Sequence, residues 1–217
     1  QNPVFAADEI EREKGVIIEE INMYEDTPMR HVEDLLEEAM WPDQPLGRNI
    51  AGTREVIRQM TPRDIRHYVK IYYQPANTII SVTGAYNSKV LAKLISRHWA
   101  KIKPVKFPHW QKAVDKQLKP RVRLESKKTE QCHLAVGFRS YHHNHPNYIP
   151  QIVLGTILGG GRSSRLFTEI SERRGLAYYV KAGTTNYQAT GNFVVKAGLR
   201  VNALAEAIGT IFEQLKK

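Results

Sequence analysis

The sequence predicts an α+β fold, with two-layer units in which helices pack on a mainly antiparallel sheet. Three observations favour this class. The first hundred residues have helical periodicity and a single strand-like run, and the second hundred alternate strand-like and helical runs. In addition, 41% of the residues are hydrophobic and 25% are charged, with no long apolar run, which is typical of a globular chain. No membrane partner is therefore expected.

The N-terminal part of the sequence is predicted to be helical. From position 8 to position 40 the apolar residues recur at helix-compatible spacing, and Pro28 is expected to break this stretch into two helices. The proline- and glycine-containing run 41–53 predicts a loop.

The next elements are predicted from a helix cap and a β-branched run. Thr61, Pro62 and Asp64 provide a cap, a first-turn proline and an acid near the positive end of a helix. The run 77–84, "NTIISVTG", is β-branched and ends in glycine, so it predicts a strand. A helix is expected over 88–100.

The second half supplies most of the predicted sheet. Strand-like runs cover 121–126, 131–138, 176–183 and 191–199, and helical runs cover 151–158, 163–174 and the residues from about 202 onward. The last strand-like run alternates most clearly, so Phe193, Val195, Ala197 and Leu199 are expected on one face.

The charge distribution predicts a linker between two halves. The formal net charge is +10, and much of the excess falls in the proline-punctuated stretch 101–123. Such a charge raises the hypothesis of a nucleic-acid surface, but no nucleic-acid-binding motif accompanies it. We therefore interpret residues 104–120 as a solvated basic linker and expect no nucleic-acid partner.

Three features that often mark active sites are interpreted here as structural. The single cysteine, Cys132, excludes an internal disulfide and is expected to be buried in a strand. The histidines of 142–145 precede a proline and are interpreted as a turn. Gly159, Gly160 and Gly161 fit neither phosphate-binding glycine motif, so they predict a tight helix entry.

The acidic stretch 11–21, "EREKGVIIEEI", leaves two interpretations open. Glu13 and Glu20 are seven residues apart, two helical turns, so they project from nearly the same side beside an apolar stripe. A carboxylate in that position needs a cation or a hydrogen bond to offset its desolvation. Spacing alone favours a surface or salt-bridge role over a metal-binding one.

Three longer segments together resemble the pitrilysin/insulinase family of inverted-motif zinc peptidases. They are "NPVFAADEIEREKGVIIEEI", "YYQPANTIISVTGAY" and "ILGGGRSSRLFTEISERRGLAYYVKAG". The resemblance covers nearly the whole chain in consistent order. The bacterial relatives similar to mitochondrial processing peptidase are the most similar members.

The resemblance implies a zinc site that this sequence does not contain in full. Members of the family carry an HxxEH motif, which supplies two histidine ligands and a glutamate base, and a later glutamate is the third ligand. Glu20 matches that third ligand, and Glu13 matches an acid that supports the site. Zinc held in this way lowers the pKa of a bound water to about 7. HxxEH is absent from the sequence, so no zinc is expected in this chain alone.

The resemblance also assigns the parts of the chain. Residues 1–103 correspond to the C-terminal half of a first peptidase lobe, and 121–217 to the N-terminal half of a second, with the linker between them. In the second lobe many relatives grip the substrate backbone with an arginine and a tyrosine seven residues apart. Tyr178 matches the tyrosine, but Ser171 occupies the arginine position. Whether Arg173 or Arg174 replaces that arginine stays open, as does the interpretation of Tyr178 as a packed strand residue.

The leading hypothesis is that the chain is a fragment of a zinc metalloendopeptidase, inactive alone. The alternative is a non-catalytic partner subunit that binds peptides for an active protease. A peptide or unfolded polypeptide is the expected substrate, and full-length subunits are expected to form homo- or hetero-dimers. A cytoplasmic location is predicted, with the periplasm open if a signal was removed.

Overall fold

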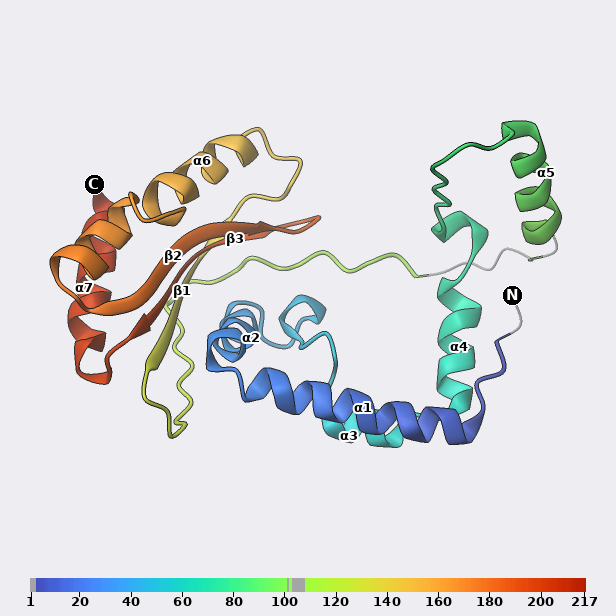
Figure 1. The fold of residues 1–217 in the computed structure, drawn as a ribbon, viewed down its shortest axis with the longest axis horizontal. Coiled ribbons are helices and arrows are strands. Elements are labelled where there is room, and N and C mark those ends of the chain that lie inside the picture. The colour runs from blue at the N-terminus through green and yellow to red at the C-terminus, as the bar shows by residue number, and fades with distance from the viewer. Residues whose placement is uncertain (1–2, 101, 103–107) are drawn as a thin grey trace. The chain divides into compact units, whose positions relative to one another are not determined.

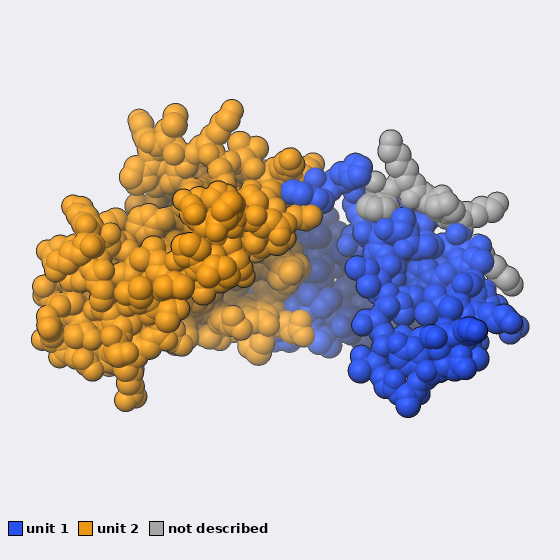
Figure 2. Space-filling model, turned by 90° about the horizontal axis from the view of Figure 1, so that it is seen from above, with its two compact units in different colours: residues 1–19, 53–110 blue, residues 20–52, 111–217 orange. Residues whose placement is uncertain are grey.

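The computed structural model describes residues 3–100, 102 and 108–217. The chain divides into two compact units: residues 1–19 with 53–110, and residues 20–52 with 111–217 (Figure 2). The predicted division at 103 and 121 stays a prediction, and positions 104–107 of its linker lie outside the described residues.

The elements define an α+β protein, as predicted (Figure 1). The α-helices are α1 (Ala7–Glu25), α2 (Pro28–Met40), α3 (Arg54–Gln59), α4 (Pro62–Tyr72), α5 (Ser88–Trp99), α6 (Tyr148–Gly159) and α7 (Leu204–Lys216). Short helices are η1 (Pro45–Gly47), η2 (Pro75–Asn77), the π-helix η3 (Phe167–Arg173) and η4 (Val201–Ala203). The strands are β1 (Cys132–Ser140), β2 (Ala177–Asn186) and β3 (Gly191–Leu199). In the described part of the chain, no helix is both long enough and apolar enough to cross a bilayer.

Local sequence signals place the ends of the first helices. The break at Pro28 is confirmed: α1 ends at Glu25, and α2 starts at Pro28 after the cap residue Thr27. The start of α4 is a capping box, in which the Thr61 hydroxyl accepts from the Asp64 N–H at 3.3 Å and the Asp64 carboxylate accepts from the Thr61 N–H at 2.8 Å. Both predicted helix starts are therefore correct.

Two predicted strands are wrong. Residues 78–83 and 121–126 belong to no sheet and run as irregular or extended chain. Their apolar side chains face outward: Ile79 is 95% exposed and Val122 is 90% exposed. A strand exists only where a neighbour completes its hydrogen bonds, and neither segment has a partner strand among the described residues.

The core of the second unit is built on β3. The sheet is antiparallel with strand order β1-β3-β2, so β3 is central. The predicted face of β3 is confirmed: its apolar residues are buried, together with Leu158, Leu166, Ile170 and Ile211 from the helices that follow the strands. Cys132, expected to be buried, is only half-buried because it starts an edge strand.

Glycines allow α6 to lie close to β2. A side chain at Gly155 would lie 3.2 Å from the Gly183 Cα, and one at Gly159 would lie 2.0 Å from the backbone nitrogen of Ala182. The predicted helix over 163–174 is mainly the π-helix η3. The helix ends at Arg173, and Gly175, with a φ of +59°, then turns the chain toward β2.

The helix α2 packs on β1 through the side chains of Leu36 and Met40. A side chain at Gly137 would lie within 3 Å of both. The same helix also makes polar contacts. Glu33 pairs with Lys196 of β3 at 2.5 Å, and Glu37 accepts a hydrogen bond from the Tyr187 hydroxyl. The second unit therefore has helices joined to its sheet by both apolar and polar contacts.

Candidate functional site

The two carboxylates singled out on α1 are exposed and available. The other acids near the start of α1 are paired: Asp8 and Glu9 with Arg12, and Glu11 with Lys14 at 2.6 Å. The side chains of Glu13 and Glu20, by contrast, make no hydrogen bond or ion pair with any described residue. The salt-bridge interpretation of these two residues therefore has no support in the described part of the chain.

The described residues do not form a metal site by themselves. Among them, no group of three histidine, cysteine, aspartate or glutamate side chains converges. In the histidine-rich loop, His145 stacks on Tyr141 with ring centroids 4.0 Å apart, and its Nδ1 accepts from the Asn147 N–H. This is the turn that the sequence predicted. A free, exposed carboxylate such as Glu20 fits one position in a zinc coordination sphere, and the other ligands would have to come from elsewhere.

Tyr178 lies at a β-bulge. Ala177 pairs with Leu199 and Tyr179 pairs with Gly198, so Tyr178 is the extra residue of β2 between two paired positions. Its side chain is 62% exposed. Bulges re-aim side chains and are frequent beside active sites. The side chain of Tyr178 is therefore largely in solvent and accessible to a ligand, and both interpretations of this strand residue stay predictions.

The arginines that precede this bulge, Arg173 and Arg174, are both paired with acidic residues. The Ser171 hydroxyl, in η3, is buried and has no hydrogen-bond partner among the described residues. Arg173 pairs with Glu169 at 2.5 Å, and Arg174 lies 3.5 Å from Glu206 of α7. Of the two arginines, Arg173 has the more exposed side chain, at 67% against 38% for Arg174.

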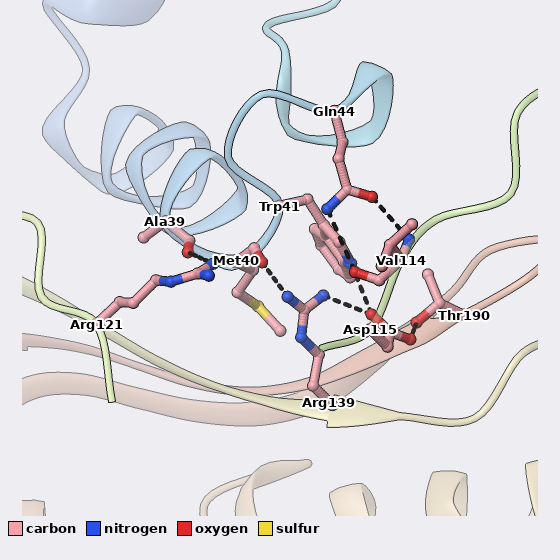
Figure 3. A network of polar contacts seen from close by, with 9 residues as sticks. All are labelled: Ala39, Met40, Trp41, Gln44, Val114, Asp115, Arg121, Arg139 and Thr190. Atoms are coloured by element: carbon pink, nitrogen blue, oxygen red, sulfur yellow. Dashed lines mark hydrogen bonds and ion pairs between the residues drawn. The ribbon is translucent and has the colours of Figure 1, made fainter. Parts of the chain in front are cut away.

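A polar network that the sequence did not predict centres on Asp115 (Figure 3). Its carboxylate accepts from Arg139 Nη1 at 2.7 Å, from Trp41 Nε1 at 3.0 Å and from the Thr190 hydroxyl. Arg139 also donates to the carbonyl of Met40. One carboxylate thus joins the end of α2, strand β1 and the loop before β3.

Burial governs the electrostatics of this network. Desolvation lowers the pKa of the Arg139 guanidinium, and the charge of Asp115 opposes that shift. The guanidinium lies 4.6 Å from the centre of the Trp41 ring, in cation–π geometry. No local pattern signals this arrangement, because the four residues are far apart in the sequence.

A small polar cavity lies between α2 and the sheet. Its volume is about 140 Å³, and its lining includes Glu33, Glu37, Thr184, Asn192 and Lys196. Burial is the main cause that raises the pKa of Tyr187, whose hydroxyl bonds to Glu37 beside the cavity. The cavity fits a few waters or a very small polar ligand.

Comparison with known proteins places this architecture in a class of peptidases. The family model described as "Peptidase M16 inactive domain" matches residues 59–217, and the one described as "Insulinase (Peptidase family M16)" matches residues 1–54. The chain therefore belongs to the M16, or insulinase, family, as its sequence resemblance predicted.

Relatives of this chain include bacterial proteins named zinc proteases. An uncharacterized zinc protease of Bacillus subtilis, YmxG, is 35% identical over 97% of this chain and 51% of its own length. One from Streptomyces coelicolor is 31% identical over 96% of this chain and 47% of its own length. The chain thus spans about half the length of these curated relatives.

Solved structures support the fold. A protease from Helicobacter pylori matches with a TM-score of 0.83 and 25% identity, over 96% of this chain and 52% of that one. A Pseudomonas fluorescens structure titled as a peptidase M16 inactive domain matches with a TM-score of 0.78 and 22% identity, over 98% and 52%. The second likeness shows the fold alone.

Proposed function

We propose that this chain is the central part of a longer zinc metalloendopeptidase, inactive alone, to which it contributes one metal ligand and a substrate-contacting surface. The observation that carries the proposal is family membership combined with Glu20, an exposed α1 carboxylate without a partner among the described residues. When bound, zinc would activate a water for attack on a peptide carbonyl.

Within this proposal the residues of the chain have separate roles. Glu20 would bind the metal, and Glu13, two turns earlier on α1, would support the site electrostatically. Tyr178 would hydrogen-bond the backbone of an extended peptide, which its bulged and exposed position allows.

A non-catalytic partner subunit is the second candidate. It is favoured by two observations: the model matching 59–217 describes an inactive domain, and serine replaces the arginine expected at position 171. In that case the surface around Tyr178 would bind peptides for an active protease.

Several wider features of the function are part of the proposal. The substrate would be a peptide or unfolded polypeptide, and full-length subunits would form homo- or hetero-dimers in the cytoplasm or periplasm. Nucleic acid is not the proposed partner, because Arg121 and Arg123 of the basic stretch are engaged with α2. Lys127, just after the stretch, pairs with Asp26 in the turn before α2.

Glu20→Gln in the full-length protein tests the metal role. The variant should lose bound zinc, measured by metal analysis, and chelator-sensitive peptide cleavage should fall at least about 100-fold. Glu19→Gln is the matched control, because Glu19 is an adjacent exposed acid that also has no partner among the described residues. Full zinc occupancy in Glu20→Gln would refute the ligand assignment. If the wild-type protein binds peptide but neither binds zinc nor cleaves the peptide, that result would support the second candidate.

Tyr178→Phe tests the substrate contact in the same protein. Loss of one hydrogen bond to the bound peptide should raise KM about 10-fold while zinc content is unchanged. Tyr179→Phe is the control, since Tyr179 is part-buried and its hydroxyl lies 3.1 Å from His133. Equal effects of the two variants on KM would contradict the assignment.

A further inference from the structure

Residues 114–127, here named the strap, are an extended segment that runs antiparallel to α2. From its start to its end the contacts, at 2.7–3.7 Å, are Asp115 with Trp41, Arg121 with the carbonyls of Ala39 and Met40, Arg123 with Glu38, Glu125 with His31, and Lys127 with Asp26. Successive strap residues thus meet successively earlier residues of the helix. The strap is therefore fixed in place although it belongs to no sheet.

The side chains of the strap alternate between two directions. The odd-numbered residues 121, 123, 125 and 127 are charged and contact α2 or the turn before it. The residues between them point the other way: Val122 is 90% exposed and Leu124 is 86% exposed. This alternation is that of a β-strand, but here the apolar side faces outward.

The backbone amide and carbonyl groups around Val122 and Leu124 lack hydrogen-bond partners among the described residues. Between residues 121 and 126, no N–H or C=O group forms a hydrogen bond with any described part of the chain. A row of free amide groups in extended conformation is complementary to another extended backbone. Val122 and Leu124 would at the same time pack against apolar side chains of that partner.

We propose that residues 121–126 accept a β-strand from a part of the full-length polypeptide outside these 217 residues. The inference rests on the proposed function only in taking the chain as part of a longer peptidase. The relatives are about twice as long as the chain, so as much polypeptide again surrounds the matched region in them. The incoming strand would carry apolar residues at alternate positions.

A permanent partner fits the strap better than a passing substrate. An extended edge with two large aliphatic side chains in water is prone to pair with other chains and aggregate, so it requires a lasting cover. The first unit contains a comparable run: Ile79, Ile80 and Val82 are exposed in a segment without a partner strand among the described residues.

Hydrogen exchange of the wild-type protein tests the inference without any mutation. In the 217-residue chain the amides of 121–126 should all exchange rapidly. In the full-length protein every second amide should exchange about 100-fold more slowly, because a strand bound at one edge engages alternate residues. This measurement is independent of catalysis and zinc, so it gives the same result for a peptidase and for a non-catalytic subunit.

A double variant tests the outward face. Val122→Asp with Leu124→Asp should lower the melting temperature of the full-length protein by about 8 °C, and leave that of the 217-residue chain unchanged. Leu118→Asp is the matched control: Leu118 lies in the same strap and is 98% exposed, so it should have no effect in either protein. If the double variant does not fold, Val122→Thr with Leu124→Thr gives the milder comparison.

Three outcomes would overturn the proposal. Rapid exchange of 121–126 in the full-length protein would mean that no strand pairs there. Slow exchange in the 217-residue chain would mean that other residues of this chain already form hydrogen bonds with the backbone of the strap. Slow exchange only after addition of a 12-residue peptide of alternating valine and threonine would assign the surface to a substrate instead.

Discussion

The two units of the chain differ most in how much apolar surface they bury. In the unit of residues 20–52 and 111–217, β3 lies at the centre of a continuous cluster with residues such as Leu166, Ile170 and Ile211 fully buried. In the unit of residues 1–19 and 53–110, the buried apolar residues among those described are Ile10 and Ile57, which keep 9% and 7% of their surface exposed. Burial of apolar area is the main stabilising contribution, and within the described residues a continuous core is found in the second unit alone.

This difference shows that strong helix-capping signals do not by themselves produce a well-packed unit. The first unit has the better helix starts, including a capping box on α4 and an N-cap at Asn87 for α5. A cap contributes about 1 kcal/mol, whereas a buried leucine contributes two to three times as much. Local structure in the first unit is therefore well specified while its tertiary packing is not.

The largest expected effect comes from emptying the core of the second unit. Leu166→Ala should lower the free energy of unfolding by about 3 kcal/mol, since Leu166 is fully buried. Leu94→Ala, the same change at a half-exposed position of α5, should cost less than about 1 kcal/mol. Urea unfolding followed by circular dichroism measures both. Similar losses would show that the two units do not differ in packing.

The next effect is expected at Asp115, which joins three parts of the second unit. Asp115→Asn should cost about 2 kcal/mol, because it leaves the half-buried Arg139 without its counter-charge. Asp43→Asn is the control: Asp43 is exposed, and its φ of +59° suits asparagine as well as aspartate. The same urea measurement applies, and an unchanged midpoint in Asp115→Asn would mean that the network does not stabilise the fold.

A smaller effect is expected at the turn into β2. Gly175→Ala should cost about 1 kcal/mol, because its φ of +59° lies in the left-handed region, which alanine tolerates less well than glycine. Gly161→Ala should be neutral, since Gly161 has open space around it and is not in a left-handed conformation. Thermal unfolding of both variants gives the comparison, and equal melting temperatures would argue against backbone strain at Gly175.

The smallest expected effect is a difference in pH dependence between the units. In the second unit, burial lowers the pKa of His133 below the ordinary value of about 6.5. The folded state then binds a proton less readily than the unfolded state. Stability is complete above that value and falls as the pH drops from about 7 to 5. His133→Gln should reduce this slope, measured by melting temperature against pH.

In the first unit, the corresponding group is Asp64. Hydrogen bonds from Thr61 lower the pKa of its carboxyl, so its contribution is present above about 3.9 and is lost only as the pH falls below that value. The protection factors of the amides at the start of α4, which compare their exchange with that of an unstructured peptide at the same pH, should therefore be unchanged between pH 7 and 5 and fall in stronger acid. Loss of protection already at pH 5 would contradict this assignment.

The sequence by itself determined the elements that depend on short-range signals, and it determined the family. The helix break at Pro28, the α4 cap, the buried face of β3 and the α+β class all follow from spacing and residue type. The family resemblance also pointed to Glu20 and Tyr178, whose roles stay predictions.

Only the tertiary structure decided which extended segments become strands and which polar residues meet. Residues 78–83 and 121–126 have strand-like sequences, but a strand needs a neighbour, and sequence pattern does not reveal one. The bulge that exposes Tyr178 depends on its register with β3. The Asp115 network joins residues as far apart as Trp41 and Thr190, and such long-range contacts arise only when the chain packs.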